Sequence, residues 1–279
     1  MRFINLVLLA SSVLAAPPMP KLPSTLPTVV FTPGAWHGTW AFDTVRSQLG
    51  ALGYPTEAVA LPSVGSNDLN VGLAEDAAAL RTELTTLADE GKDIIMVVHS
   101  YGGMVATNAV EGLSYADRRA AGKRGGVTML IYMTAFAVPL GTSLLNGLGG
   151  QYLPWMILGE NQQDGFVTPA TPEEVFYADV TDSALVAKAV AGLEHEPARI
   201  FSDKTTYEPW NSGVNVGFFF TELDQAIPIA TQKGMASQFG DSYFSYTMNS
   251  SHSPFLSMPQ KVVEGVVLAS KDAALKKLL

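Results

Sequence analysis

The chain has 279 residues, of which 47% are hydrophobic and 15% are charged, so it can bury a large core of its own. Its 17 Lys and Arg against 26 Asp and Glu give a net charge of -9 without a long basic run, which argues against nucleic acid as a partner. The absence of cysteine excludes disulfides, thiolate catalysis and cysteine-based metal sites. The 4 histidines are scattered singly, so we expect no catalytic metal.

The first 15 residues predict a secretory signal peptide. Arg2 supplies one positive charge, residues 4–14 are mainly apolar, and Val13 and Ala15 are placed for cleavage after Ala15. The apolar stretch is shorter than the roughly 20 residues that a membrane-spanning helix needs. Residues 16–27 are rich in proline and predict an extended lead-in to the fold. We therefore expect a secreted protein without a membrane span.

From residue 28 onward the sequence alternates apolar runs with amphipathic segments. Apolar residues at steps of three and four over 69–90 predict a helix with one buried face, which ends at Gly91. Strand-like apolar runs, most of them continuous as parallel strands covered on both faces require, occur at residues 29–31, 94–98, 129–133, 216–220 and 243–248. This alternation predicts an α/β fold with a doubly wound, mostly parallel sheet.

Residues 138–213 interrupt this rhythm. They are rich in Gly and Pro and contain no strand-like apolar run. Thr171 and the three residues after it, Pro-Glu-Glu, have the pattern of a helix start with a capping box. Because a loop of this length needs structure of its own in a compact domain, we expect a helical lid over 138–213. The core is then made of residues 28–137 and 214–279.

The segment Val98-His99-Ser100-Tyr101-Gly102-Gly103 carries the expected chemistry. It follows a strand-like run and precedes a helix-like segment, so Ser100 is predicted to lie on a sharp turn with its hydroxyl exposed above the sheet edge. Small residues on both sides normally allow this turn, and Val98 departs from that pattern. A Gly-rich turn with an ordinary N-capping serine is the alternative.

Two later segments supply the partners that a serine nucleophile needs. Asp224 follows the run at 216–220, and His252 follows the run at 243–248, on a loop before a helix. The order Ser100, Asp224, His252 is that of an α/β-hydrolase triad, with each residue at the carboxyl end of a strand. Glu222 is the alternative acid, because in an extended segment it points the same way as Asp224. We favour Asp224 because the acid belongs on the loop beyond the strand.

A Gly-rich turn at residues 32–40 completes the expected site. Such a turn can aim the backbone N–H of Ala35 at the same point as the N–H of Tyr101, which forms an oxyanion hole. The alternative is a plain turn whose tryptophans belong to the core. Candidate pocket-lining residues are Trp36, His37, Phe136 and Trp155.

These motifs resemble the α/β-hydrolase superfamily from about residue 28 to the C-terminus. Five segments are similar to the branch that contains plant methylesterases, hydroxynitrile lyases and their microbial esterase relatives, at residues 33–37, 61–65, 99–103, 176–179 and 251–256. The resemblance implies a nucleophile, base and acid at Ser100, His252 and Asp224, with oxyanion donors at Ala35 and Tyr101. Pro33 stands where many members have His, but this change removes no backbone donor.

The implied reaction is cleavage of a small uncharged carboxylic ester or lactone through an acyl-enzyme, without a cofactor. Two other functions stay open. One is a hydroxynitrile lyase reaction, in which the family uses a Lys directly after the catalytic His, a position held here by Ser253. The other is a non-catalytic relative that binds a small hydrophobic ligand.

Overall fold

The computed structural model describes residues 26–159 and 165–277. The expected signal peptide, residues 1–15, lies outside the described residues, as does most of the proline-rich lead-in. Within the described ranges, no helix is both long enough and apolar enough to cross a membrane.

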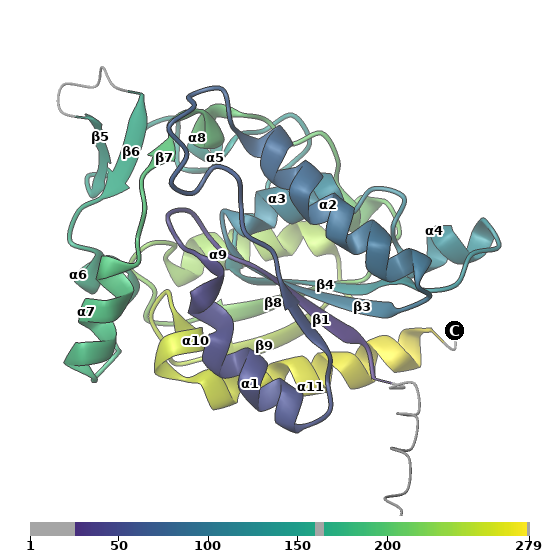
Figure 1. Cartoon of the computed structure of the whole chain (residues 1–279). Coiled ribbons are helices and arrows are strands. Elements are labelled where there is room, and N and C mark those ends of the chain that lie inside the picture. The colour runs from purple at the N-terminus through teal and green to yellow at the C-terminus, as the bar shows by residue number, and fades with distance from the viewer. Residues whose placement is uncertain (1–25, 160–164, 278–279) are drawn as a thin grey trace, which may run out of the picture.

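A six-stranded parallel sheet forms the centre of the molecule, with the strand order β2-β1-β3-β4-β8-β9 (Figure 1). Its strands are β1 (Thr28–Thr32), β2 (Thr56–Ala58), β3 (Asp93–Ser100), β4 (Gly126–Ala135), β8 (Val216–Thr221) and β9 (Phe244–Met248). The order reverses between β1 and β3, which creates the switch point where open α/β sheets bind ligands. The predicted doubly wound, mostly parallel sheet is confirmed. Strand β2 was not predicted, because its three residues are partly exposed and carry no apolar run.

The central strands send alternate side chains into two cores. Val30, Met96 and Leu130 belong to the core under α2 (Leu73–Asp89), α3 (Gly102–Ala109) and α9 (Ile229–Ala236). Their neighbours Val29 and Ile95 belong to the opposite core, under α1 (Asp43–Ala51), α10 (Pro254–Ser257) and α11 (Pro259–Lys276). Because successive strand residues point to opposite faces, burial on both sides requires the continuous apolar runs seen in the sequence.

The predicted helix at 69–90 forms as α2 but begins only at Leu73. Gly72 has an extended backbone, and its N–H donates to the Glu75 carboxylate at 2.8 Å, which caps the helix. Leu69 fits the helical spacing but lies before this cap and is 46% exposed. Shorter helical segments at the edges of the core are α4 (Tyr115–Ala120), η1 (Thr39–Phe42) and η4 (Ser237–Phe239).

The described residues of 138–213, called the insertion below, lie between β4 and β8, and most of their helices and strands lie on one side of the molecule (Figure 1). The helical elements of the insertion are α5 (Leu144–Gly147), α6 (Pro172–Phe176), α7 (Ser183–Ala191), α8 (Arg199–Ser202) and η3 (Pro209–Asn211). It also contains three short strands, β5 (Met156–Leu158), β6 (Phe166–Pro169) and β7 (Glu196–Pro197), which pair as an antiparallel sheet. The insertion thus contains helices, as expected, together with three short strands that were not predicted, because strands of two to four residues leave no detectable apolar run.

The start of α6 also differs from the prediction. Thr171 is the N-cap residue and Pro172 occupies the first turn, but Thr171 has a φ of 43° and its side chain makes no capping hydrogen bond. A capping side chain reaches the first-turn amides from an extended backbone, not from the left-handed region. The predicted capping box is therefore absent from this helix.

Candidate active site

Ser100 is the last residue of β3 and lies on a sharp turn into α3. Its φ of 51° is in the left-handed region, which a residue with a side chain adopts only when its surroundings enforce it. A Cβ atom on Gly102 would lie 2.5 Å from the carbonyl oxygen of Pro33, and one on Gly103 would lie 2.5 Å from that of Phe136. The two glycines after the serine are therefore required by close approach of backbone on both sides.

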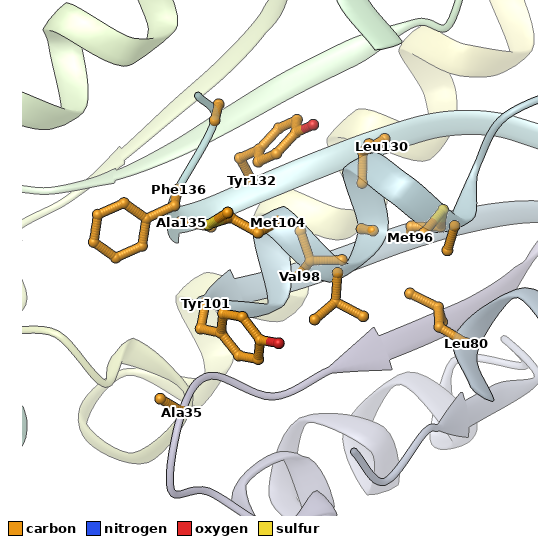
Figure 2. Packing of buried hydrophobic residues seen from close by; sticks show 14 of the residues in the cluster. Ala35, Leu80, Met96, Val98, Tyr101, Met104, Leu130, Tyr132, Ala135 and Phe136 are labelled. Atoms are coloured by element: carbon orange, nitrogen blue, oxygen red, sulfur yellow. The ribbon is translucent and has the colours of Figure 1, made fainter. Parts of the chain in front are cut away.

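Val98 does not prevent this turn. Its side chain is fully buried and belongs to the core under α2 and α3, where Figure 2 shows it among other buried apolar side chains of this layer. The valine therefore fills space in this core that a glycine would leave empty.

His252 and Asp224 form a buried hydrogen-bonded pair. Asp224 lies on the loop after β8 and His252 on the loop between β9 and α10, and Nδ1 of His252 lies 2.8 Å from Oδ2 of Asp224. A proton on Nδ1 leaves Nε2 as the ring atom able to accept another proton. Glu222 is exposed on the same loop, so the structure places Asp224, not Glu222, beside the histidine.

Besides His252 and the more distant Gln232 amide at 3.5 Å, four donors hold the Asp224 carboxylate in place. Its Oδ2 accepts hydrogen bonds from the hydroxyls of Thr134 at 2.5 Å and Thr221 at 3.0 Å. Its Oδ1 accepts the backbone N–H groups of Ala226 and Ile227, each at 2.8 Å. The sequence analysis missed Thr134 and Thr221, although both lie at the carboxyl ends of strands.

These partners decide the charge of Asp224. Burial raises the pKa of this carboxyl, but the His252 ring and the hydrogen bonds from His252, Thr134 and Ile227 outweigh it, so the pKa is lowered below the usual range. Asp224 is therefore ionised at neutral pH and stabilises positive charge on His252.

Ser100 and His252 line the same pocket, together with Ala35 and Tyr101. Among the described residues, the backbone N–H groups of Ala35 and Tyr101 have no hydrogen-bond acceptor. Trp36 N–H, by contrast, donates to the Glu196 carboxyl at 2.8 Å and is already engaged. Of the two neighbouring amides on this loop, Ala35 is the one left for a ligand.

The pocket is narrow, with a cavity volume of about 20 Å³. Three of the four candidate lining residues, Trp36, Phe136 and Trp155, are part of its wall. The other wall residues are mostly apolar and come largely from the insertion: Leu144, Leu148, Leu153, Met156, Phe176, Phe201, Ala226 and Ile227. Among the described residues of the wall, only Tyr101 and His252 have ionisable side chains, so the pocket suits an uncharged ligand.

His37 is not part of the pocket wall, which corrects the sequence-based expectation. It is 2% exposed, its Nδ1 lies 2.7 Å from the carbonyl oxygen of Ala35, and the Tyr177 hydroxyl donates to its Nε2 at 2.9 Å. Burial, the largest effect, lowers the pKa of His37 to about 4. A neutral His37 therefore holds the loop at Ala35 through the hydrogen bond to the Ala35 carbonyl oxygen.

His99 supports the histidine loop in a similar way. Its Nε2 donates to the carbonyl oxygen of His252 at 2.8 Å, and the two ring centroids lie 4.5 Å apart. Burial, then the neighbouring His252 and His37, lowers the pKa of His99 well below its usual value. A neutral His99 therefore helps to fix the His252 backbone.

No group of three or more His, Asp or Glu side chains within residues 26–159 and 165–277 is arranged to hold a metal ion. The ionisable groups of the site instead form hydrogen bonds that hold two loops near Ser100. One loop carries Ala35 and His37, and the other carries His252. This geometry brings a serine hydroxyl, a histidine hydrogen-bonded to a carboxylate, and two backbone N–H groups without a described acceptor around one apolar pocket.

Comparisons with known proteins identify the family and the fold. The curated relative "Alpha/beta hydrolase nvfD" of Aspergillus novofumigatus is 29% identical over 266 residues, covering 88% of this chain and 98% of the relative. The solved structure of the methylesterase protein MES16 from Arabidopsis has a TM-score of 0.68 at 23% identity, covering 88% of this chain and 99% of that one.

A pyrethroid hydrolase from Sphingobium faniae has the same fold, with a TM-score of 0.68 at 18% identity and coverage of 88% of this chain and 98% of that one. The sequence pattern of the alpha/beta hydrolase family matches residues 29–265, which includes Ser100, Asp224 and His252. The chain therefore belongs to the alpha/beta hydrolase family.

Proposed function

We propose that this protein is a serine hydrolase that cleaves small uncharged carboxylic esters or lactones through an acyl-enzyme. The observation that carries the proposal is that Ser100, on a strained turn, and His252, hydrogen-bonded to buried Asp224, line one apolar pocket. A merely ligand-binding protein has no need of the ionised Asp224 and the four donors that hold it.

In the first half of the proposed reaction, the Ser100 oxygen attacks the ester carbonyl carbon while Nε2 of His252 accepts the hydroxyl proton. The carbonyl oxygen becomes an oxyanion that accepts hydrogen bonds from the N–H groups of Ala35 and Tyr101. When this intermediate collapses, the bond to the alcohol oxygen breaks, His252 protonates the departing alcohol, and the acyl group stays on Ser100.

In the second half, water attacks the acyl carbon and gives a proton to Nε2 of His252. The bond to the Ser100 oxygen then breaks, the proton returns to that oxygen, and the carboxylic acid leaves. Asp224 stays ionised throughout, holds the proton-accepting tautomer and stabilises the imidazolium in both halves.

The pocket wall supports an uncharged substrate with an apolar acyl or aryl group. Apolar residues of the insertion face Ser100, and a charged substrate group would be desolvated there without a partner. The resemblance in fold to proteins described as a methylesterase and a pyrethroid hydrolase supports ester cleavage as the reaction class.

The test uses the purified protein and its Ser100→Ala variant on p-nitrophenyl esters of rising chain length, aryl methyl esters and lactones. We expect turnover by the wild type that falls by a factor on the order of 10³ to 10⁶ in the variant, and labelling by a fluorophosphonate at Ser100 only. Turnover within about tenfold of the wild type in Ser100→Ala would contradict the proposal.

A hydroxynitrile lyase reaction needs a cation beside the base to stabilise departing cyanide. Ser253, directly after His252, is buried, and Lys261 on α11 is 57% exposed and pairs with Glu264 at 2.8 Å. We therefore expect negligible benzaldehyde release from mandelonitrile in parallel assays. If benzaldehyde release exceeds that of the Ser100→Ala control and no ester is cleaved, the protein is a hydroxynitrile lyase and not an esterase.

We further propose that the protein is secreted after cleavage behind Ala15, a proposal supported by the sequence of residues 1–15. Expression of the full chain in a secreting host should give a product in the medium whose intact mass corresponds to a start at Ala16. Retention of residues 1–15 on the recovered protein would contradict this.

A further inference from the structure

Two carboxyl groups are buried beside the oxyanion loop, outside the proposed triad. Asp76 on α2 and Glu196 on β7 are both fully buried, and the hydroxyl of Ser63 lies between them. Ser63 Oγ is 2.7 Å from Oδ2 of Asp76 and 2.9 Å from Oε1 of Glu196. A single hydroxyl therefore bridges two acids that come from the core and from the insertion.

This bridge requires an additional proton. A serine hydroxyl has one hydrogen, so it can donate to only one of the two acids and must accept from the other. Two ionised carboxylates would leave one oxygen-to-oxygen contact at hydrogen-bond distance without a proton between them. One of the two acids is therefore protonated in the folded state.

The remaining donors identify which acid holds the proton. Asp76 accepts two further hydrogen bonds, from the backbone N–H of Ser63 at 2.9 Å and from the hydroxyl of Tyr101 at 2.8 Å. From the rest of the described chain, Glu196 accepts one further hydrogen bond, from the backbone N–H of Trp36 at 2.8 Å, through Oε2. Three donors favour ionised Asp76, so the chain of donation runs from Glu196 through Ser63 to Asp76.

The surrounding charges agree with this assignment. Burial, then the neighbouring Asp76, raises the pKa of Glu196 well above its usual value, and burial also raises the pKa of Asp76. The other charged groups that act on this cluster, Glu75 on α2 and Asp203 after α8, are acids as well. Among the described residues no cation forms an ion pair with either carboxyl, because Arg199 pairs with Asp203.

This series of hydrogen bonds ends at Trp36 and at Tyr101. Trp36 follows the proposed oxyanion donor Ala35, and Tyr101 is itself the second proposed donor. At one end, Glu196 holds Trp36, whose φ of 66° is strained and which directly follows Ala35. At the other end, Asp76 holds the side chain of Tyr101, whose own N–H is the second donor. Figure 2 shows Ala35 and Tyr101 close together at this end of the core.

We propose that Glu196, Ser63 and Asp76 are positioning residues that share one proton and set the geometry of the oxyanion hole, with Glu196 as the neutral acid. This inference rests on the proposed ester hydrolysis. When Glu196 loses its proton at alkaline pH, two like charges face each other across Ser63. The contact between β7 and α2 then weakens, the loop carrying Ala35 is released, and turnover falls.

The test compares Glu196→Gln with Asp76→Asn. A Gln amide can accept from Trp36 and donate to Ser63, as the neutral acid does, so we expect kcat within about threefold of the wild type at neutral pH. An Asn at 76 places a donor against the Ser63 or Tyr101 hydroxyl, so we expect kcat to fall by at least about tenfold with little change in KM. Glu174→Gln, an exposed change on α6, is the control for both.

Two further measurements do not depend on how well Asp76→Asn folds. The alkaline decline of kcat caused by Glu196 should be present in the wild type and in Glu174→Gln and absent from Glu196→Gln. Infrared spectra at neutral pH should show a protonated carboxyl band that disappears in Glu196→Gln alone.

Equal effects of the two substitutions, a reversed ranking, or a carboxyl band that persists in Glu196→Gln would each overturn the assignment of the proton. If the wild type shows no turnover that depends on Ser100, the proposed function is wrong. The role of Glu196, Ser63 and Asp76 in positioning an oxyanion hole is then wrong as well. The infrared spectrum still tests separately whether Glu196 is protonated, because the carboxyl band is measured without an activity assay.

Discussion

Gly34 lies directly against Ser100: a Cβ atom built on Gly34 would be 2.7 Å from Cβ of the serine and 2.9 Å from Nδ1 of His99. The loop that carries Ala35 therefore approaches the turn at Ser100 as closely as backbone allows. Only a glycine lets the proposed oxyanion donor and the nucleophile face the same point.

Gly34→Ala should therefore displace the loop, lower kcat for a p-nitrophenyl ester by at least about tenfold and destabilise the fold by about 1–3 kcal/mol. The matched control is Gly50→Ala on α1, where nothing lies within 4 Å of the new methyl group, and which should stabilise the helix by about 0.5–1 kcal/mol. Equal turnover by Gly34→Ala and Gly50→Ala would show that the loop accommodates a Cβ atom at position 34 without displacing Ala35.

Asp224→Asn should reduce kcat by a factor on the order of 10³ to 10⁴, because an amide in place of the carboxylate selects the wrong tautomer of His252. Glu222→Gln should change kcat by less than about twofold, because Glu222 is exposed and Asp224 makes the contact with the histidine. Steady-state kinetics on the same ester measures both. The opposite ranking would make Glu222 the acid.

Thr134→Val removes the 2.5 Å hydrogen bond to Asp224 while keeping the shape of the side chain. We expect kcat to fall about tenfold, because a hydrogen bond to a charged group contributes about 1.5–3 kcal/mol and part of that loss reaches the histidine. Thr107→Val is the control, since the Thr107 hydroxyl is also buried but pairs with Tyr132 at 2.8 Å. Both variants should lose stability in urea titrations, and only Thr134→Val should lose activity.

The contribution of His37 to the stability of the protein should decrease as the pH falls from about 6.5 towards 4. With its pKa lowered to about 4, folded His37 stays neutral in this range while the unfolded chain binds a proton, so acid favours unfolding. His37 alone accounts for at most about 3 kcal/mol of this loss. Burial shifts His99 in the same direction.

Chemical denaturation at several pH values between 4 and 7 measures this slope. His37→Gln should show a shallower dependence of the unfolding free energy on pH than the wild type, whatever its absolute stability. Parallel slopes would mean that His37 is not held neutral by burial.

The sequence by itself determined the sheet and the order of the three proposed triad residues along the chain. The core strands must be apolar without interruption because both faces are covered, and helix α2 must repeat its apolar residues every three to four positions, so both patterns are visible locally. Ser100, Asp224 and His252 could be named because each directly follows a strand-like run, and carboxyl ends of parallel strands meet at one edge.

Only the tertiary structure decided which neighbours surround those groups. Trp36 and Glu196 are 160 residues apart, and Thr134 and Asp224 are 90 apart, so no local pattern relates them. The sequence does not show whether His37 lies in a solvated or a buried loop. Only the fold buries its side chain, which lowers its pKa and keeps the ring neutral. Local periodicity records which side of an element is buried, whereas hydrogen bonds between distant segments depend on how the insertion packs on the sheet.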